Sequence, residues 1–369
     1  MMLMLVGFVV VIIFGGGIAR ADFGFGEPVN LGQPINSSSH EFTVAISTDN
    51  LEMYISSDRP GGVGYFDIYR RTRQNEVDPW GPLVNVETIN GSYNDSYPCL
   101  AADGLTLYFS DWYNWNTNSN RPGGRGDHDL WMSTRANTVD SWGPPVNMGA
   151  VVNSAYADVS PCVSQDGQIL IFSSKRPGGY GNYDLWMSTR PTADSDWTKP
   201  VNMGPELNSS AYDGEPWLSP DGLTLFFSSE CPPGRTNSSD IWVTTRRSRD
   251  AAWSPPVNLG APINTSNPDG SPSFSPDLKT FYFNSNRSGG FGGWDMYEVP
   301  IVPILDFNGD GIIDTDDLLI LMDYWNTSES LCDIGPLPWG DGVVDMKDLE
   351  VFIEYWEKEN MPQELEGNQ

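Results

Sequence analysis

The stretch SSKRPGGYGNYDLWMSTR, Ser173 to Arg190, contains an Arg-Pro-Gly-Gly segment followed by an Asp-Leu-Trp triplet. Its glycines allow backbone N–H groups to approach an anion closely, so the segment fits a ligand-binding loop. It fits a turn between two β-strands equally well, because Gly supplies positive φ and Pro fixes φ at the turn. The two interpretations differ in how often the segment should occur in the chain.

The same pattern occurs five times. The triplet or a relative of it begins at Asp67, Asp129, Asp184, Asp240 and Asp295, with spacings of 62, 55, 56 and 55 residues. A second marker, Val-Asn, begins at Val29, Val84, Val146, Val201 and Val257. The Arg-Pro-Gly-Gly segment or a relative begins at Arg59, Arg121, Arg176 and Arg287, with Cys-Pro-Pro-Gly at Cys231. A ligand loop is seldom repeated five times, so the pattern favours a turn whose Arg pairs with the following Asp.

Each repeat contains four short segments with strand character, separated by turn signals. In the third copy they span 159–164, 168–174, 183–190 and 199–204. Asp166-Gly167 between the first two predicts a tight hairpin turn with positive φ at both central residues. Four antiparallel strands at this period predict the blades of a β-propeller, an all-β fold.

The two ends of the repeat region complement each other. The chain begins with a lone fourth strand, GEPVNLG at 26–32, and the fifth repeat stops after its third strand at Val299. Pairing the two removes an open sheet edge, so we predict a five-bladed propeller closed by its N-terminal strand over about seven residues of ladder. Aromatic residues that precede the fourth strands are expected to pack between the blades: Phe25, Trp80, Trp142, Trp197 and Trp253.

Together with SPDGLTLFFSS (219–229) and DLWMSTR (184–190), the region 26–300 resembles the TolB-like, WD-related propeller repeats of bacterial envelope and secreted proteins. The resemblance implies the fold and leaves the function open, because such propellers host binding and enzymatic roles alike. The N-terminal domain of TolB is not recognisable, so a TolB-like transport role is not implied.

Four repeats place an acid three residues before a proline of the first strand: Asp95, Asp158, Asp213 and Asp269. The first repeat has His40-Glu41 there. A ring of carboxylates at the channel mouth fits the binding of a cation or sugar hydroxyls, or a glycosidase acid/base pair. Alternatively each acid caps its own turn, which its recurrence favours. With two histidines and no Gly-x-Ser-x-Gly motif, the sequence argues against Ser-His-Asp chemistry.

The second repeat carries an insertion, DWYNWNTNSN at 111–120. Trp112, Tyr113 and Trp115 lie there among amide and hydroxyl residues, a composition that suits stacking on sugar rings or a protein contact. With Asp158 and Asp213 on the same face, they form the candidate ligand site. The alternative is a lid that folds over its own blade.

Residues 301–369 contain 17 Asp and Glu against two Lys, a net charge of −15 out of −29 for the whole chain. This acidity argues against nucleic acid and anionic membranes as partners, because neutralising phosphate requires Lys and Arg. After a predicted linker at 301–305, the segment 306–317 has oxygen side chains at loop positions 1, 3, 5, 9 and 12, and Gly at position 6. Ca²⁺ requires such a set around a sharp turn. The expected ligands are Asp306, Asn308, Asp310, the carbonyl of Ile312, Asp314 and Asp317; the alternative is an acidic helix cap.

The pattern returns 31 residues later, after an amphipathic helix. Asp341, Asp345 and Asp348 keep their ligand positions, whereas Leu337 and Trp339 occupy the first and third. Asp333 is a candidate to replace the missing ligand by means of a longer loop. Paired calcium loops with Asp at the twelfth position resemble a type I dockerin, which we assign to 306–358, with an acidic tail at 359–369. The resemblance implies docking to a cohesin-like partner and association with polysaccharide-degrading enzymes.

The N-terminus, an apolar run ending in Ala19-Arg20-Ala21, predicts a secretory signal peptide at 1–21, with an uncleaved anchor as the alternative. No later stretch is apolar enough to span a bilayer. Cys99 and Cys162 occupy equivalent places in neighbouring repeats, where buried free thiols are favoured over a disulfide.

The sequence therefore predicts a secreted or cell-envelope protein, periplasmic location included. The predicted protein combines a five-bladed propeller (22–300) with a small all-α module that binds Ca²⁺. We expect a non-catalytic binding or scaffold protein that recognises a carbohydrate or a protein. The alternative is a glycoside hydrolase that uses carboxylates at the channel mouth, and a purely structural envelope component is a third hypothesis.

Overall fold

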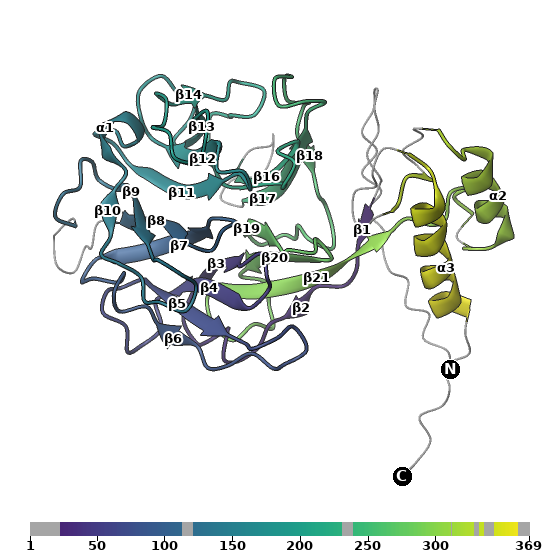
Figure 1. The fold of residues 1–369 in the computed structure, drawn as a ribbon, viewed down its shortest axis with the longest axis horizontal. Coiled ribbons are helices and arrows are strands. Elements are labelled where there is room, and N and C mark those ends of the chain that lie inside the picture. The colour runs from purple at the N-terminus through teal and green to yellow at the C-terminus, as the bar shows by residue number, and fades with distance from the viewer. Residues whose placement is uncertain are drawn as a thin grey trace, which may run out of the picture. The chain divides into compact units, whose positions relative to one another are not determined.

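The computed structural model describes residues 23–112, 121–230, 239–310, 312–327, 332–335 and 343–360. The chain divides into two compact units, Pro28–Val299 and a second unit that combines residues 1–27 with residues 300–369. The first unit is an all-β propeller of five blades (Figure 1). No helix within the described ranges is long and apolar enough to cross a membrane. The predicted signal peptide lies outside the described residues.

Four blades are built from consecutive strands. They comprise β3 (Glu41–Ile46), β4 (Glu52–Ser57), β5 (Asp67–Thr72) and β6 (Val84–Asn85); β7 (Asn94–Leu100), β8 (Thr106–Trp112), β9 (Leu130–Thr134) and β10 (Val146–Asn147); β11 (Asp158–Val163), β12 (Ile169–Ser174), β13 (Asp184–Thr189) and β14 (Val201–Asn202); and β15 (Asp213–Leu218), β16 (Thr224–Ser229), β17 (Asp240–Thr245) and β18 (Val257–Asn258). The fifth blade joins β19 (Asp269–Phe274), β20 (Thr280–Ser285) and β21 (Asp295–Pro303) to β2 (Val29–Asn30). A short helix, α1 (Gly149–Val152), follows β10.

The first strand of each blade is the innermost one. Along the ring β3 contacts β7, β7 contacts β11, β11 contacts β15, β15 contacts β19, and β19 contacts β3 again. Five blades therefore complete the circle.

The predicted strands of the third repeat agree with β11, β12 and β13 to within one residue, but the fourth strand is only two residues long. The turn at Asp166-Gly167 also differs from the prediction, because only Gly167 has positive φ, at 69°. Ser164 closes this turn instead: its carbonyl accepts from Gly167 N at 2.8 Å and its hydroxyl donates to Asp166 at 2.6 Å.

The aspartate of each triplet binds the turn that precedes it. In the third blade Asp184 accepts from the backbone N–H groups of Tyr180 (2.6 Å) and Gly181 (2.8 Å), and from Asn202 Nδ2 at 2.8 Å. Asn202 is the Asn of the Val-Asn marker, so one carboxylate joins the turn to the fourth strand. The first Gly of the turn, Gly178, has a φ of 100°, as a positive-φ turn residue should.

The prediction that the turn Arg pairs with this following Asp is wrong. Arg176 pairs with the preceding acid, Asp158, at 2.6 Å. The register explains the difference, because Asp158 lies opposite Ser174 and the chain brings Arg176 back alongside it.

The N-terminal segment supplies the fourth strand of the last blade. Val29 lies opposite Glu298 and Asn30 opposite Tyr297, which is a ladder of two residue pairs where about seven residues were expected. Side chains add to it: Asn30 Nδ2 donates to Asp295 at 3.0 Å, and Asn36 brackets Met296 by accepting from its N–H and donating to its carbonyl. The same Asp-Asn-Asn network occurs in each of the other blades, where it connects residues close in sequence.

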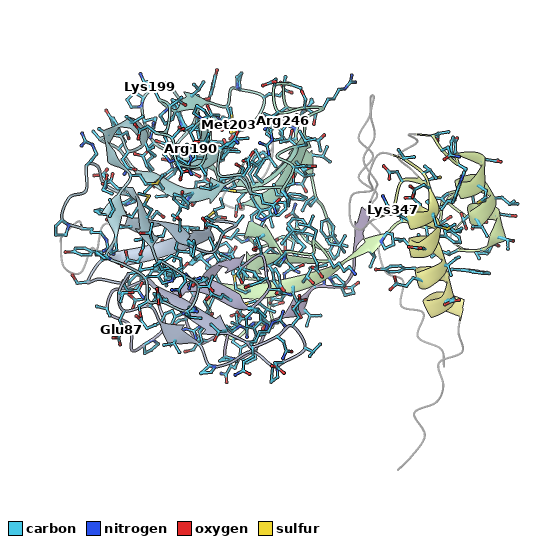
Figure 2. All side chains as sticks on the ribbon, viewed as in Figure 1. Glu87, Arg190, Lys199, Met203, Arg246 and Lys347 are labelled. Carbon is cyan, nitrogen blue, oxygen red and sulfur yellow. The ribbon has the colours of Figure 1, made fainter. Side chains whose placement is uncertain are left out.

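The core consists of apolar clusters between adjacent blades. Trp142 is buried among residues of the first two blades, as predicted, and Trp80, Trp197 and Trp253 are half-buried at equivalent places. An arginine stacks on each ring, as Arg190 does on Trp197 and Arg246 on Trp253. Figure 2 labels these two arginines. Cys99 and Cys162 are free thiols, as favoured from the sequence.

The second unit begins with β1 (Phe23–Phe25), which pairs with residues 301–303 of β21. Gly26 N donates to Pro300 O at 3.0 Å, as the residue after each blade tryptophan donates to the end of its third strand, so Phe25 holds the equivalent backbone position and is buried, as predicted. Most of the predicted linker is strand, in keeping with its β-branched Ile301 and Val302. Helices α2 (Thr315–Asp323) and α3 (Met346–Asn360) follow. They enclose a core that includes Phe307, Leu321 and Phe352.

Candidate functional site

The four predicted aspartates all lie at the start of an innermost strand and are fully buried; each is 0% exposed. Asp158 accepts from Ser154 N, Ser174 Oγ and Arg176 Nη2, all within 2.6 Å. Asp95 and Asp269 have the same type of backbone and arginine contacts, through Arg121 and Arg287. The hydrogen bonds match the turn-capping interpretation, because each carboxylate is held by its own blade.

Asp213 lacks a described arginine partner, because the equivalent segment begins at Cys231, outside the described residues. Ser209 and Ser229 hold it instead, with Ser229 Oγ at 2.6 Å. Burial raises the pKa of Asp213, and it raises the pKa of Asp95 to about 6 despite the nearby Arg121. Glu41 of the first blade is equally buried, between Ser37, Ser57 and Arg59.

The propeller axis is lined instead by the residue two positions after each acid. These residues are Thr43, Tyr97, Ser160, Glu215 and Ser271, and all five have a φ between 50° and 54°. A β-bulge lies at this point in every innermost strand. The bulge leaves the extra residue unpaired with the neighbouring strand and redirects its side chain. A central cavity of about 20 Å³ is lined by these five residues and by Pro161, Pro216 and Pro272.

Glu215 is the one carboxylate among the residues that line this cavity. Its Oε1 accepts from Tyr97 OH at 3.0 Å, and its Oε2 accepts from Ser228 Oγ and Ser271 N, both at 2.7 Å. Burial, together with the charge of Glu215, holds the pKa of Tyr97 well above its usual range, so Tyr97 remains a hydrogen-bond donor.

Aromatic side chains pack beside Tyr97, next to the central cavity. Phe42 packs against Tyr97, Phe66 and Trp294, with ring centroids 6.2, 5.4 and 5.7 Å apart. Phe42, Phe66 and Trp294 are half-buried, and Tyr65, which packs edge-on against Phe66, is 49% exposed. We call Phe42, Phe66, Tyr97 and Trp294 the aromatic mouth.

His40 and a tyrosine pair border the aromatic mouth. His40 stacks on Phe42, and its Nδ1 lies 3.0 Å from Asp58 Oδ2. Tyr183 packs against Tyr212, and its hydroxyl lies 3.4 Å from His128 Nδ1. Burial lowers the pKa of His128 to about 4, so this histidine is neutral at physiological pH.

The axial and mouth residues were missed from the sequence, although a signal for them exists. The position before each Asp triplet holds a different residue in every repeat: Phe66, His128, Tyr183, Ser239 and Trp294. The axial position holds four residue types in five repeats, with Ser at two of them. Variation inside a repeat marks the places where copies are free to acquire different contacts.

The predicted insertion site is not testable in the same detail. Tyr113, Trp115 and the side chain of Trp112 lie outside the described residues, although the backbone of Trp112 belongs to β8. A polar hollow of about 490 Å³, lined by residues such as Arg125 and Asn153, lies between the second and third blades. A larger groove of about 510 Å³ runs beside β5 and β6, and its Glu87 is labelled in Figure 2.

The first acidic loop of the second unit is folded around its own carboxylates. Asp317 is fully buried and accepts from the N–H groups of Phe307 (2.8 Å), Asn308 (3.2 Å) and Asp314 (3.0 Å). Asp306 accepts from Gly309 and Asp310, and Asp310 from Ile312. Asp314 caps α2 together with Asp317.

The second loop repeats this arrangement with a longer insertion. Asp348 is fully buried and accepts from Gly335 N at 2.7 Å and Asp345 N at 2.6 Å, and burial raises its pKa. Gly335 therefore corresponds to Asn308, which places Asp333 at the position of Asp306. Asp341 lies outside the described residues.

The oxygen donors of the first loop fit a hard cation in number and type. In the described ranges, however, no three acidic, His or Cys side chains converge closely enough to hold a metal ion. The carboxylates of this loop accept backbone N–H groups instead, so a cation would have to draw them together.

No protein-family model and no curated protein matches the chain. Among solved structures, it is similar to TolB from Acinetobacter baumannii, at 13% identity and a TM-score of 0.44 over 71% of this chain, spanning 54% of TolB. It is also similar to an alpha-L-arabinofuranosidase from Lactobacillus brevis, at 14% sequence identity and a TM-score of 0.47 over 73% of this chain and 92% of that one. A third similar structure is an endo-arabinase from Bacteroides thetaiotaomicron, with 13% sequence identity and a TM-score of 0.47 over 76% of this chain and 97% of that one. Likeness at this level says nothing about activity.

Proposed function

We propose that this protein is a non-catalytic recognition protein whose propeller binds a carbohydrate at the aromatic mouth, and whose C-terminal module docks onto a protein partner in a calcium-dependent manner. The observation that carries the first part is the packing of Phe42, Phe66 and Trp294 beside Tyr97 and Glu215 at the channel. Half-buried rings next to hydrogen-bonding groups suit a sugar, which offers an apolar face and hydroxyl edges.

Binding is favoured over hydrolysis because of where the carboxylates lie. A glycosidase needs two carboxyl groups facing the scissile bond, about 5–9.5 Å apart. Asp95, Asp158, Asp213 and Asp269 are fully buried and occupied by their own turns, and Glu215 is the sole carboxylate lining the central cavity among the described residues.

A glycan-array screen followed by a reducing-sugar assay tests this proposal. We expect retention of a glycan without sugar release, and weaker retention by Trp294→Ala than by Trp253→Ala, a substitution of a half-buried tryptophan far along the blade. Sugar release that is lost in Asp158→Asn or Asp213→Asn supports the glycoside hydrolase alternative instead. The absence of both binding and release contradicts the proposal.

The calcium proposal rests on the two buried aspartates, Asp317 and Asp348, which have no basic partner among the residues that the structure describes. Backbone N–H groups compensate part of the cost of burying these carboxylates, and a cation would compensate more of it. Asp306, Asn308, Asp310, Ile312, Asp314 and Asp317 would hold the first ion. Asp333, Asp341, Asp345 and Asp348 would contribute to the second, and the ions would order both loops.

The module also exposes apolar side chains at equivalent positions of its two halves. Ile312 and Val343 are 60% and 44% exposed, and Met322 and Ile353 are 45% and 40% exposed. Exposed apolar residues that recur in this way suit a protein contact, and the dockerin resemblance makes a cohesin-like partner the first candidate. Pull-down from envelope extracts with and without chelator tests it: capture in calcium alone is expected, and capture unaffected by chelator contradicts calcium dependence.

We further propose export to the cell surface or envelope, on the basis of the signal-like N-terminus. Fractionation that leaves the mature protein in the cytoplasm overturns this. Finally, we propose that the N-terminal strand, through β2 and Asn36, keeps the propeller ring closed.

A further inference from the structure

We propose that the central cavity of the propeller binds one monovalent alkali cation, Na⁺ or K⁺, between Glu215 and the hydroxyl groups of Thr43, Ser160 and Ser271. This site adjoins the aromatic mouth, with which it shares Tyr97, and it uses none of the residues of the acidic loops of the C-terminal module. It does not rest on the proposed carbohydrate binding.

The first reason is a set of hydroxyl groups that lack partners. Thr43, Ser160 and Ser271 line the same cavity, and none of their hydroxyl groups has a hydrogen-bond partner among the residues that the structure describes. Ser160 and Ser271 are 3% and 2% exposed, so bulk water does not satisfy them. Buried polar groups in native proteins are nearly always paired with protein, water or an ion.

The second reason is the charge of Glu215. Its hydrogen-bond donors in the described ranges are all neutral: the hydroxyls of Tyr97 and Ser228 and the backbone N–H of Ser271. No ion pair joins Glu215 to a basic side chain in the described part of the propeller. Tyr97 uses one lone pair of Oε1 and leaves another available to a ligand. Glu215 is half-buried, so its charge is only partly solvated and a neighbouring positive charge would stabilise it.

A third observation is that Gly270, which has no side chain, lies where three side-chain oxygen atoms approach the backbone beside the axis. A Cβ atom on Gly270 would lie 2.7 Å from Glu215 Oε2, 3.1 Å from Ser228 Oγ and 3.3 Å from Asn284 Oδ1. Asn284 is 1% exposed, and both polar atoms of its amide lack partners in the described part of the chain. Further buried oxygen and nitrogen groups thus lie around the same carboxylate, ready to bind an ion or its water ligands.

Size and charge select the kind of ion. The cavity of about 20 Å³ accommodates one water-sized species. Ca²⁺ takes six to eight oxygen ligands that usually include several carboxylates, and Mg²⁺ keeps several waters, for which this cavity has no room. A single carboxylate with neutral hydroxyls balances one positive charge, which fits Na⁺ or K⁺. The competing occupant is one water molecule.

Thermal unfolding of the full chain distinguishes these occupants. The melt is recorded in NaCl, KCl or N-methyl-D-glucamine chloride at equal ionic strength, with calcium held at a fixed saturating level so that the C-terminal loops do not change. Binding to the native state alone raises the folding equilibrium constant about tenfold when the cation is present at about ten times its dissociation constant. We expect this gain in NaCl or KCl, and its loss in Glu215→Gln.

Glu230→Gln is the matched control, because it removes one exposed carboxylate from the same blade and should keep the full cation effect. If Glu215→Gln fails to fold, Ser160→Ala takes its place, and crystals of the wild-type protein grown in RbCl or thallous acetate provide a second measurement. An anomalous peak within bonding distance of Glu215 and Ser160 supports the proposal. Equal stability in all three salts, or a water molecule without anomalous signal at the axis, overturns it.

Discussion

Replacing Asn36 with Ala tests how firmly the N-terminal segment belongs to the fifth blade. The Asn36 side chain accepts from Met296 N at 2.8 Å and donates to Met296 O at 2.9 Å and to Asn30 Oδ1 at 2.7 Å. Met296 is 0% exposed, and its carbonyl keeps a second donor, Leu31 N at 3.0 Å. An orphaned buried N–H costs about 1–3 kcal/mol and each other lost bond about 1 kcal/mol, so we expect a loss of roughly 3 kcal/mol in unfolding free energy.

The chain supplies a close control for this substitution. In the third blade Asn208 makes the same contacts, with Leu185 N at 2.7 Å, Leu185 O at 3.0 Å and Asn202 Oδ1 at 3.0 Å. Asn208→Ala removes these bonds within one stretch of sequence, whereas Asn36→Ala removes bonds between the two ends of the propeller. Urea unfolding followed by tryptophan fluorescence, in constant calcium, measures both variants.

If the ring unfolds as one cooperative unit closed by β2, both substitutions cost about the same and leave the urea dependence unchanged. A loss below about 1 kcal/mol for Asn36→Ala, beside the full loss for Asn208→Ala, would mean that the N-terminal strand contributes little to the blade and would refute the reasoning.

Three further predictions concern charge. Burial and the neighbouring Asp95 and Asp129 raise the pKa of Asp111 to about 7, so near neutral pH the folded protein binds a proton that the unfolded chain does not. Lowering the pH from 8 to 6 should therefore raise the unfolding free energy by about 1 kcal/mol through this group, and Asp111→Asn should abolish that part of the pH dependence in urea titrations. Arg176→Met should cost about 3–5 kcal/mol by leaving Asp158 buried and unpaired, and a thermal shift no larger than that of an exposed-arginine control would contradict this. Calcium removal should speed amide exchange in α2 and α3 while exchange in β11 to β13 stays unchanged; equal exchange in both conditions would count against an ion in the acidic loops.

The fold was predictable because the recurring residues are those that form the turns and hydrogen bonds of each blade. Val-Asn and the Asp triplet recur because Asn202 and Asp184 bind each other, and their equivalents do so in every blade. The partner of Arg176 was not predictable from spacing, because strand register and not sequence order brings it to Asp158.

The axial residues were hidden for a different reason. A residue before proline normally adopts an extended conformation, and simple alternation then decides which face its side chain occupies. Ser160 and Glu215 precede prolines yet have φ of 54° and 51°, because a bulge interrupts the ladder at that point. The buried aspartates recur in four repeats and were therefore predicted as site residues. The residues of the candidate site lie at positions where the repeats differ from one another.

The dissociation constant of the best array-selected glycan, measured by calorimetry for the wild type, Trp294→Ala and Trp253→Ala, tests the recognition proposal most directly. The account predicts saturable binding without turnover that weakens at least tenfold in Trp294→Ala and stays within about twofold in Trp253→Ala, consistent with about 1–3 kcal/mol for a stacked aromatic ring. Equal affinity in all three proteins would place the ligand away from the aromatic mouth and contradict the account.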